Sequence, residues 1–269
     1  MPAKISRFHF PGKVWKMEVQ PAEKVLAIEV RSAATDNPGF WVQRLDTYVA
    51  EPQLVVEGGN LWEHLAGYSN GVLVIQGYQE PGLPLPQGIK VFEVKTGKLR
   101  WEDPLRTFRH INGEKILAVT NGMTVRYEEL DLKDGQPVLL TQQDWQAKAE
   151  QAEAIRFGGL HFPVLSQVGD PGTGEVEGLI RAELNVTPKF HLETLTIEGI
   201  SLVAWYAANG GDSLAHNLSV WCRGVHLQTI TLDPGATKLA LDSFMVLDKW
   251  LIAHHTDGSL SIAELGKLC

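Results

Sequence analysis

The feature that most constrains the fold is a series of short runs rich in β-branched and aromatic residues, each bounded by turn residues. Residues 24–32 (KVLAIEVRS), 71–79 (GVLVIQGYQ) and 200–208 (ISLVAWYAA) are examples, and similar runs recur along most of the chain. Such runs are typical of β-strands. We therefore predict an all-β protein. Its architecture is a sandwich, a barrel or a propeller, and the spacing of the strands has to distinguish these three.

Glycine turns inside strand–turn–strand units recur at nearly regular intervals. From Gly97 to Gly135 is 38 residues, and from Gly224 to Gly266 is 42 residues. The blades of a β-propeller repeat about every 40 to 45 residues. The gap from Gly135 to Gly224 is about two such periods, so we place one more unit in residues 178–199.

Earlier turns extend the same series toward the N-terminus. Gly12 lies about two periods before Gly97, and Glu51 and Pro52 supply a turn between them. The count predicts one β-propeller domain over residues 1–269 with about six blades, while five or seven blades also fit.

Two segments depart from the plain repeat. Residues 141–157 are rich in Ala, Gln, Glu and Lys, and Thr141 and Asp144 have the spacing of a capping box, so we predict one inserted helix there. At the N-terminus, residues 12–19 (GKVWKMEV) read as an outer strand with little before it. We expect this N-terminal strand to close the last blade, whose other strands come from residues 244–265.

Three stretches resemble repeats of known propellers. Residues 89–101 (IKVFEVKTGKLRW) resemble a quinoprotein-type repeat, residues 254–267 (HHTDGSLSIAELGK) are similar to part of a WD repeat, and residues 216–224 are a third partial match. The resemblance is to the quinoprotein-like and WD-repeat-like β-propeller superfamily, without a named member. It implies a propeller fold. The adjacent cysteines that flank a quinone cofactor in that family are missing here, so no cofactor is predicted.

Two groups of polar residues are candidate metal sites. His254, His255 and Asp257 are close in sequence, but adjacent strand residues point to opposite faces, and Asp257 with Gly258 is a hairpin signal. We interpret them as a turn. Glu177 lies with Asp170 and Glu175 in a Gly-rich stretch that matches no EF-hand spacing, and we interpret that stretch as a solvated loop. No metal-binding or catalytic residue is predicted.

The connections differ in length. Turns between third and fourth strands are short, whereas several connections between second and third strands are long and emerge on one face of a propeller. Loops on a rigid scaffold often carry binding residues, so we predict a binding face on the acidic loop residues Asp36, Glu80, Asp170, Glu175 and Asp212. We interpret the protein as a non-enzymatic scaffold that binds a protein partner. The alternative is a propeller enzyme such as a metal-dependent lactonase or glycosidase.

Charge and cysteine content bound the setting. The net charge of -8 and the pI of about 5.6 disfavour nucleic acid, and no stretch reaches the ~20 apolar residues of a membrane span. Without a secretory signal pattern, we expect a cytoplasmic protein. Cys222 and Cys269 then fit reduced thiols better than a disulfide, although one isolated disulfide stays open.

Overall fold

The computed structural model describes residues 5–32, 34, 37–47, 50–80, 83–210 and 213–269. The chain forms two compact units. We call Phe10–Gly158 the central unit, and Met1–His9 together with Gly159–Cys269 the terminal unit. Strands dominate both units, which confirms the all-β prediction. The interpretation as a single domain stays a prediction.

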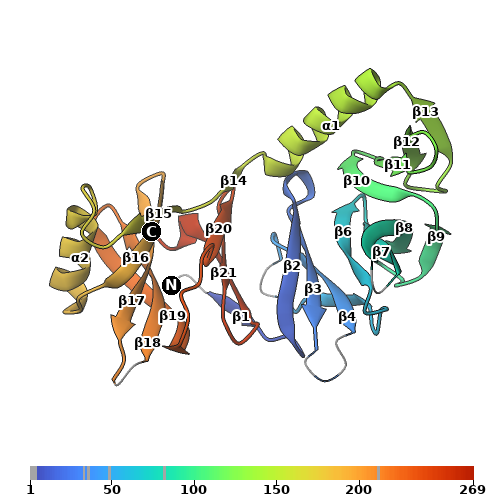
Figure 1. Ribbon diagram of the computed structural model, residues 1–269. Coiled ribbons are helices and arrows are strands. Elements are labelled where there is room, and N and C mark those ends of the chain that lie inside the picture. Colours follow the sequence, from blue (N-terminus) through green and yellow to red (C-terminus); the bar gives the residue numbers. More distant parts are fainter. Residues whose placement is uncertain (1–4, 33, 35–36, 48–49, 81–82, 211–212) are drawn as a thin grey trace. The chain divides into compact units, whose positions relative to one another are not determined.

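The central unit contains three antiparallel sheets whose strand order follows the chain (Figure 1). Each sheet has four strands, so each is a simple meander joined by its own turns. The first sheet is β2 (Lys13–Gln20), β3 (Val25–Arg31), β4 (Pro38–Arg44) and β5 (Gln53–Val56); the second is β6 (Glu63–Ser69), β7 (Val72–Glu80), β8 (Leu83–Glu93) and β9 (Leu99–Asp103); the third is β10 (Thr107–Asn112), β11 (Lys115–Thr120), β12 (Arg126–Asp131) and β13 (Pro137–Leu140).

The middle sheet of the central unit is buried on both faces. Leu73 and Ile75 of β7 belong to the core shared with the first sheet, and their neighbours Val72 and Val74 belong to the core shared with the third sheet. This is why β7 reads as a continuous apolar run, since both of its faces need apolar side chains. Each fully buried side chain of this kind contributes about 1.5–3 kcal/mol.

The terminal unit contains two further antiparallel sheets. One face of the β15–β19 sheet packs on the other sheet, and its opposite face carries the helix α2 (Gly174–Leu184). The first sheet is β15 (Val164–Gln167), β16 (Lys189–Ile197), β17 (Ile200–Ala208), β18 (Leu214–Cys222) and β19 (Val225–Ala236); the second has the order β1 (Ser6–Phe8), β22 (Leu260–Glu264), β21 (Trp250–His254), β20 (Phe244–Leu247) and β14 (Leu160–His161).

The predicted helix is confirmed as α1 (Gln142–Phe157), which lies in the central unit beside the third sheet (Figure 1). Its first turn is capped as expected, because the side chain of Thr141 accepts a hydrogen bond from the backbone N–H of Asp144 at 3.1 Å. Its own residues Ala149 and Ala152 are buried. Short 3-10 turns also occur at η1 (Pro21–Glu23) and η2 (Leu265–Lys267).

The prediction of about six blades is not confirmed, because the described residues form five sheets. Residues 178–199, expected to form a strand–turn–strand unit, begin inside α2 and reach only one strand, β16. The turns at Gly97 and Gly135 do join third and fourth strands, whereas the turn at Gly224 joins the fourth and fifth strands of its sheet. Gly266 does not, since it lies in η2 after the last strand.

The N-terminal strand joins the last sheet, but it is a different strand from the one predicted. Residues 6–8 form β1 and pair antiparallel with β22, with Arg7 opposite Ser261. The predicted strand, residues 12–19, instead begins the first sheet of the central unit as β2. The prediction is therefore right about which sheet the N-terminal segment completes and wrong about the residues that complete it.

The expectation of reduced thiols is also wrong. Cys222, at the end of β18, forms a disulfide with Cys269, and their Cα atoms are 5.7 Å apart. Stable disulfides are rare in a reducing cytosol, so this pair removes one reason for a cytoplasmic location, which stays a prediction. Among the described residues, the helices are too short or too polar to cross a membrane.

Candidate functional site

Two of the five predicted binding residues have described side chains, and both lie in the terminal unit. Asp170 is exposed and its carboxylate accepts the backbone N–H of Gln167 at 2.9 Å. Glu175 is exposed in the first turn of α2. The stretch expected to be a solvated loop is therefore partly a helix start, and the connection from β15 to β16 is not one between second and third strands.

The side chains of the other three predicted residues lie outside the described part of the structure. Asp36 and Asp212 lie outside the described residues, and Glu80 ends β7 with its side chain outside them. By chain position, Asp36 falls between β3 and β4, and Glu80 is the last residue of β7. One face shared by all five residues stays a prediction.

Within the central unit, strand direction brings several connections to one end. Strands alternate in direction in each meander, so the connection from the second to the third strand and the one leaving the fourth strand lie at the same end. The connections leaving the fourth strands β5 and β9 also lead into the next sheet. We call this end the loop end; its described residues are 32, 34, 37, 57–62, 104–106 and 121–125.

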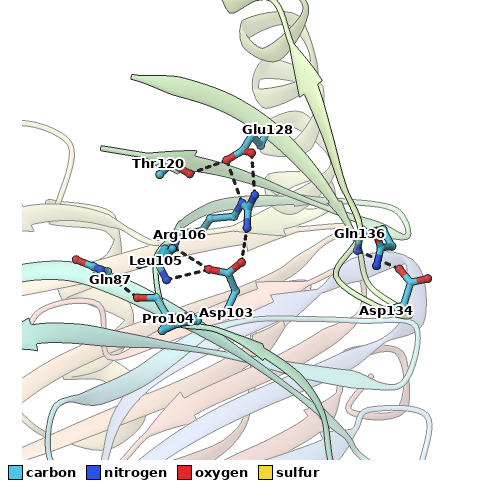
Figure 2. A network of polar contacts seen from close by, with 9 residues as sticks. All are labelled: Gln87, Asp103, Pro104, Leu105, Arg106, Thr120, Glu128, Asp134 and Gln136. Carbon is cyan, nitrogen blue, oxygen red and sulfur yellow. Dashed lines mark hydrogen bonds and ion pairs between the residues drawn. The ribbon is translucent and has the colours of Figure 1, made fainter. Parts of the chain in front are cut away.

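An ion network fixes the base of the loop end (Figure 2). Arg106 follows β9 and donates two hydrogen bonds to the carboxylate of Glu128, at 3.0 and 2.9 Å. Its guanidinium also pairs with Asp103. Glu128 accepts a further hydrogen bond from the hydroxyl of Thr120 at 2.6 Å. The network thus joins the end of the second sheet to two strands of the third.

The electrostatics hold this network in its charged form. The hydrogen bond to Glu128 raises the pKa of Arg106, and the hydrogen bond from Arg106 lowers the pKa of Glu128. Burial alone would raise the pKa of Asp103, but backbone N–H groups of Leu105 and Arg106 and the guanidinium lower it overall. Groups that stay ionised at neutral pH and are already hydrogen-bonded are structural, so we assign no proton transfer to them.

Two more buried side chains tie one sheet to the next. Glu29 of β3 accepts the backbone N–H of Leu65 on β6 at 2.8 Å. Gln76 of β7 accepts the backbone N–H of Phe108 on β10 at 2.6 Å. In both cases a side-chain oxygen on the second strand of one sheet accepts a backbone N–H from the first strand of the following sheet. The N–H lies next to a register shift in that first strand. The sequence analysis missed these residues because each reads as one polar position in an otherwise apolar strand.

Large apolar side chains are exposed on the connections of the loop end. Their relative exposure is 38% or more, although soluble proteins usually bury such side chains. The polar network bonds the connection 104–106 directly and holds Thr120 beside the connection 121–125, so burial of Leu105 is not needed to fix its connection. The exposed side chains are Leu61, Leu105, Met123 and Val125; Leu85, near the start of β8, is exposed as well.

Two cavities lie beside these connections. One, of about 330 Å³, is lined by apolar side chains including Val30 and Leu54, together with Trp41. The indole N–H of Trp41 is buried and has no acceptor among the described residues. The other, of about 260 Å³, is lined by polar side chains including Lys90 and Asp103. The loop end therefore offers both apolar and polar recesses.

A second polar cluster, in the terminal unit, superficially suggests catalysis. The hydroxyl of Ser243 lies 3.2 Å from Nε2 of His216 and donates to the carboxylate of Glu193. In a serine hydrolase the carboxylate orients the histidine and the histidine receives the serine proton. Here the carboxylate holds the hydroxyl itself, and all three side chains are buried. The cluster anchors the segment before β20.

Burial and the neighbouring His191 keep His216 neutral, because together they lower its pKa to about 4. The ring of His216 stacks on Tyr206 with centroids 4.2 Å apart. A neutral, stacked imidazole is a packing element of the sheet end at neutral pH.

The predicted turn at Asp257 and Gly258 is confirmed between β21 and β22. Asp257 accepts the backbone N–H of Ser259 at 2.9 Å, and Gly258 has a positive φ of 85°. His255 is buried and bonds to the hydroxyl of Ser261. Within the described part of the chain, no three His, Cys, Asp or Glu side chains gather in a way that could hold a metal ion.

No protein-family model matches the chain, and no curated protein sequence matches it. Among solved structures, it is similar to the β-propeller domain of the Trilobed protease from Pyrococcus furiosus, with 11% identity, a TM-score of 0.36, and 93% of this chain and 79% of that chain covered. It is also similar to the AtxE2 isopeptidase, with 12% identity, a TM-score of 0.41, and 93% of this chain but only 49% of that chain covered. An oligogalacturonate lyase in complex with manganese has 10% identity, a TM-score of 0.32, and coverages of 97% and 90%. We take the functional proposal from this chain's own residues.

Proposed function

We propose that this protein is a non-enzymatic scaffold of the β-propeller type and that the loop end of its central unit binds a protein partner. The observation that carries the proposal is the set of exposed apolar side chains on connections that a polar network holds in place. Leu105 illustrates it, because its backbone N–H is bonded to Asp103 while its side chain is 63% exposed. Exposed apolar side chains on a rigid base are typical of protein-binding surfaces.

The charge of the loop end indicates the chemistry of the partner. The described connections carry one acidic residue, Glu57, and their basic residue, Arg106, is already paired. The whole chain adds a net charge of -8. We therefore commit to a partner segment with apolar anchor residues next to Lys or Arg, which the field of this surface attracts.

A displayed library of random peptides tests this proposal with no knowledge of the partner. Panning on the immobilised chain should enrich peptides that combine apolar and basic residues. Leu105→Glu and Met123→Glu should each weaken the enriched peptides by about ten-fold or more, the effect of a central anchor. Leu99→Glu is the matched control, because Leu99 is similarly exposed but follows a turn at the opposite end.

Two results would contradict the proposal. One is enrichment of acidic peptides, or of none. The other is binding that falls as much in Leu99→Glu as in the two loop-end variants, since that would place the contact elsewhere or reflect general destabilisation.

A further inference from the structure

The terminal unit has a cavity of about 220 Å³ between the first turns of α2 and one face of its sheet. The helix contributes Glu175, Val176 and Leu179. Farther along, Ile180 packs fully buried against the sheet, so the helix closes on the strands there and leaves space nearer its start. The sheet supplies the rest of the lining, mainly Thr194, Thr196, Ser201, Val203 and Trp221.

The carboxylate of Glu175 beside this cavity is not used in an ion pair within the described residues. Glu175 is exposed and makes no ion pair with any described residue, whereas Glu177, two positions along, accepts from Thr173 and pairs with Arg181. A carboxylate left free beside a cavity is available to a ligand.

The sheet side of the cavity offers hydroxyls and an indole. The hydroxyls of Thr196 and Ser201 lie 3.1 Å apart and can each donate or accept. Trp221 is only 2% exposed, and its indole N–H finds no acceptor in the part of the chain that the structure describes. A buried donor without an acceptor is unfavourable, and a ligand oxygen would satisfy it.

We propose that this cavity binds a small neutral polyhydroxylated molecule of monosaccharide size. Its volume corresponds to roughly seven water molecules at about 30 Å³ each. Vicinal hydroxyls can donate to the carboxylate of Glu175 and present oxygens to Trp221, while the C–H face of a sugar ring packs on apolar side chains. A simple cation would satisfy Glu175 but leave the indole donor unpaired, and an anion would be repelled by Glu175.

Titration of the whole ¹⁵N-labelled chain with D-glucose, and in parallel with D-galactose and D-mannose, tests this site. At least one sugar should give saturable amide shifts in residues 175–179, 194–203 and 221, and should move the indole N–H resonance of Trp221. Glu175→Gln should weaken that binding about ten-fold, because a charged acceptor is lost. Ser201→Ala should weaken it as well.

Glu183→Gln is the control, because Glu183 is exposed on the same helix and does not line the cavity. The proposal is overturned if no sugar shifts these resonances at millimolar concentrations, or if the shifts lie elsewhere. It is also overturned if choline or acetate produces them instead, or if Glu183→Gln weakens binding as much as Glu175→Gln. The readout does not depend on the loop end of the central unit, so the outcome is independent of the proposed function.

Discussion

Replacing Arg106 by methionine should destabilise the central unit by about 3–5 kcal/mol. Methionine keeps much of the aliphatic stem and removes the charge. Glu128 is only 6% exposed, so without its partner it becomes a buried carboxylate held by Thr120 alone, and an uncompensated buried charge costs about this much. Asp103 adds little to the loss, because its side chain stays 18% exposed and can hydrate.

A double variant separates lost charge from lost contact. Glu128→Gln keeps the shape of the side chain and removes the stranded charge, so Arg106→Met with Glu128→Gln should be more stable than Arg106→Met alone by about 1–3 kcal/mol. Arg44→Met is the matched control, since the pair of Arg44 with Asp46 is 58% and 42% exposed and should contribute less than about 1 kcal/mol.

Hydrogen exchange of amides in β10–β12 measures the local free energy of opening in each variant, and chemical denaturation gives the global value. The reasoning is refuted if Arg106→Met costs no more stability than Arg44→Met, or if adding Glu128→Gln restores no stability.

The pH dependence of the unfolding free energy provides a further check. The pKa of Glu128 is lowered in the folded protein, so its contribution is complete above the unfolded value near 4.5 and disappears as the pH falls through the folded value.

Three further predictions concern the terminal unit. Reducing the disulfide of Cys222 and Cys269, which are 47 residues apart, should lower the unfolding free energy by about 4 kcal/mol through loop entropy; an unchanged denaturation midpoint in reductant would contradict this. Removing the chain up to His9 should lower hydrogen-exchange protection of the β22 amides that face β1 and leave β3 protected, and unchanged protection of those amides would show that β1 contributes nothing. Because the pKa of His216 falls from 6.5 to about 4 on folding, its contribution of about 3 kcal/mol should be intact above pH 6.5 and lost as the pH falls toward 4; His216→Gln should flatten that slope, and an identical slope would refute the assignment.

Local pattern was enough to predict the strands, the short hairpin turns and α1. Each of these carries its own signal over a few residues. The signals are a strand-like residue pattern, a turn glycine that adopts a positive φ, and the capping residue Thr141. The second helix, α2, was not predicted from the sequence because its local signal is weak. Its first five residues include Gly174 and Gly178, which weaken the helical signal, and its stability comes from packing Ile180 on the sheet.

The errors beyond α2 come from information that one sequence does not hold. An extended segment at residues 6–8 or at 12–19 can equally complete a sheet, and only the pairing with β22 distinguishes them. The pairing of Cys222 with Cys269 depends on the distance between chain segments. The Arg106 network joins residues up to 22 positions apart, so its members read as ordinary surface charges until the sheets are packed.

In the central unit, the residues that stabilise the sheets differ from the exposed residues that we propose bind a partner. Cohesion between successive sheets comes from apolar cores, from the buried side chains of Glu29 and Gln76, and from the partly buried Arg106. The exposed side chains of Leu105 and Met123 take no part in these cores, so replacing them removes little burial and should leave stability nearly unchanged. If the loop end binds a partner, affinity and stability should therefore respond to different residues. Substitutions at Leu105 or Met123 should change affinity alone, whereas Arg106→Met should lower both, because the connection that carries Leu105 depends on that network for its position.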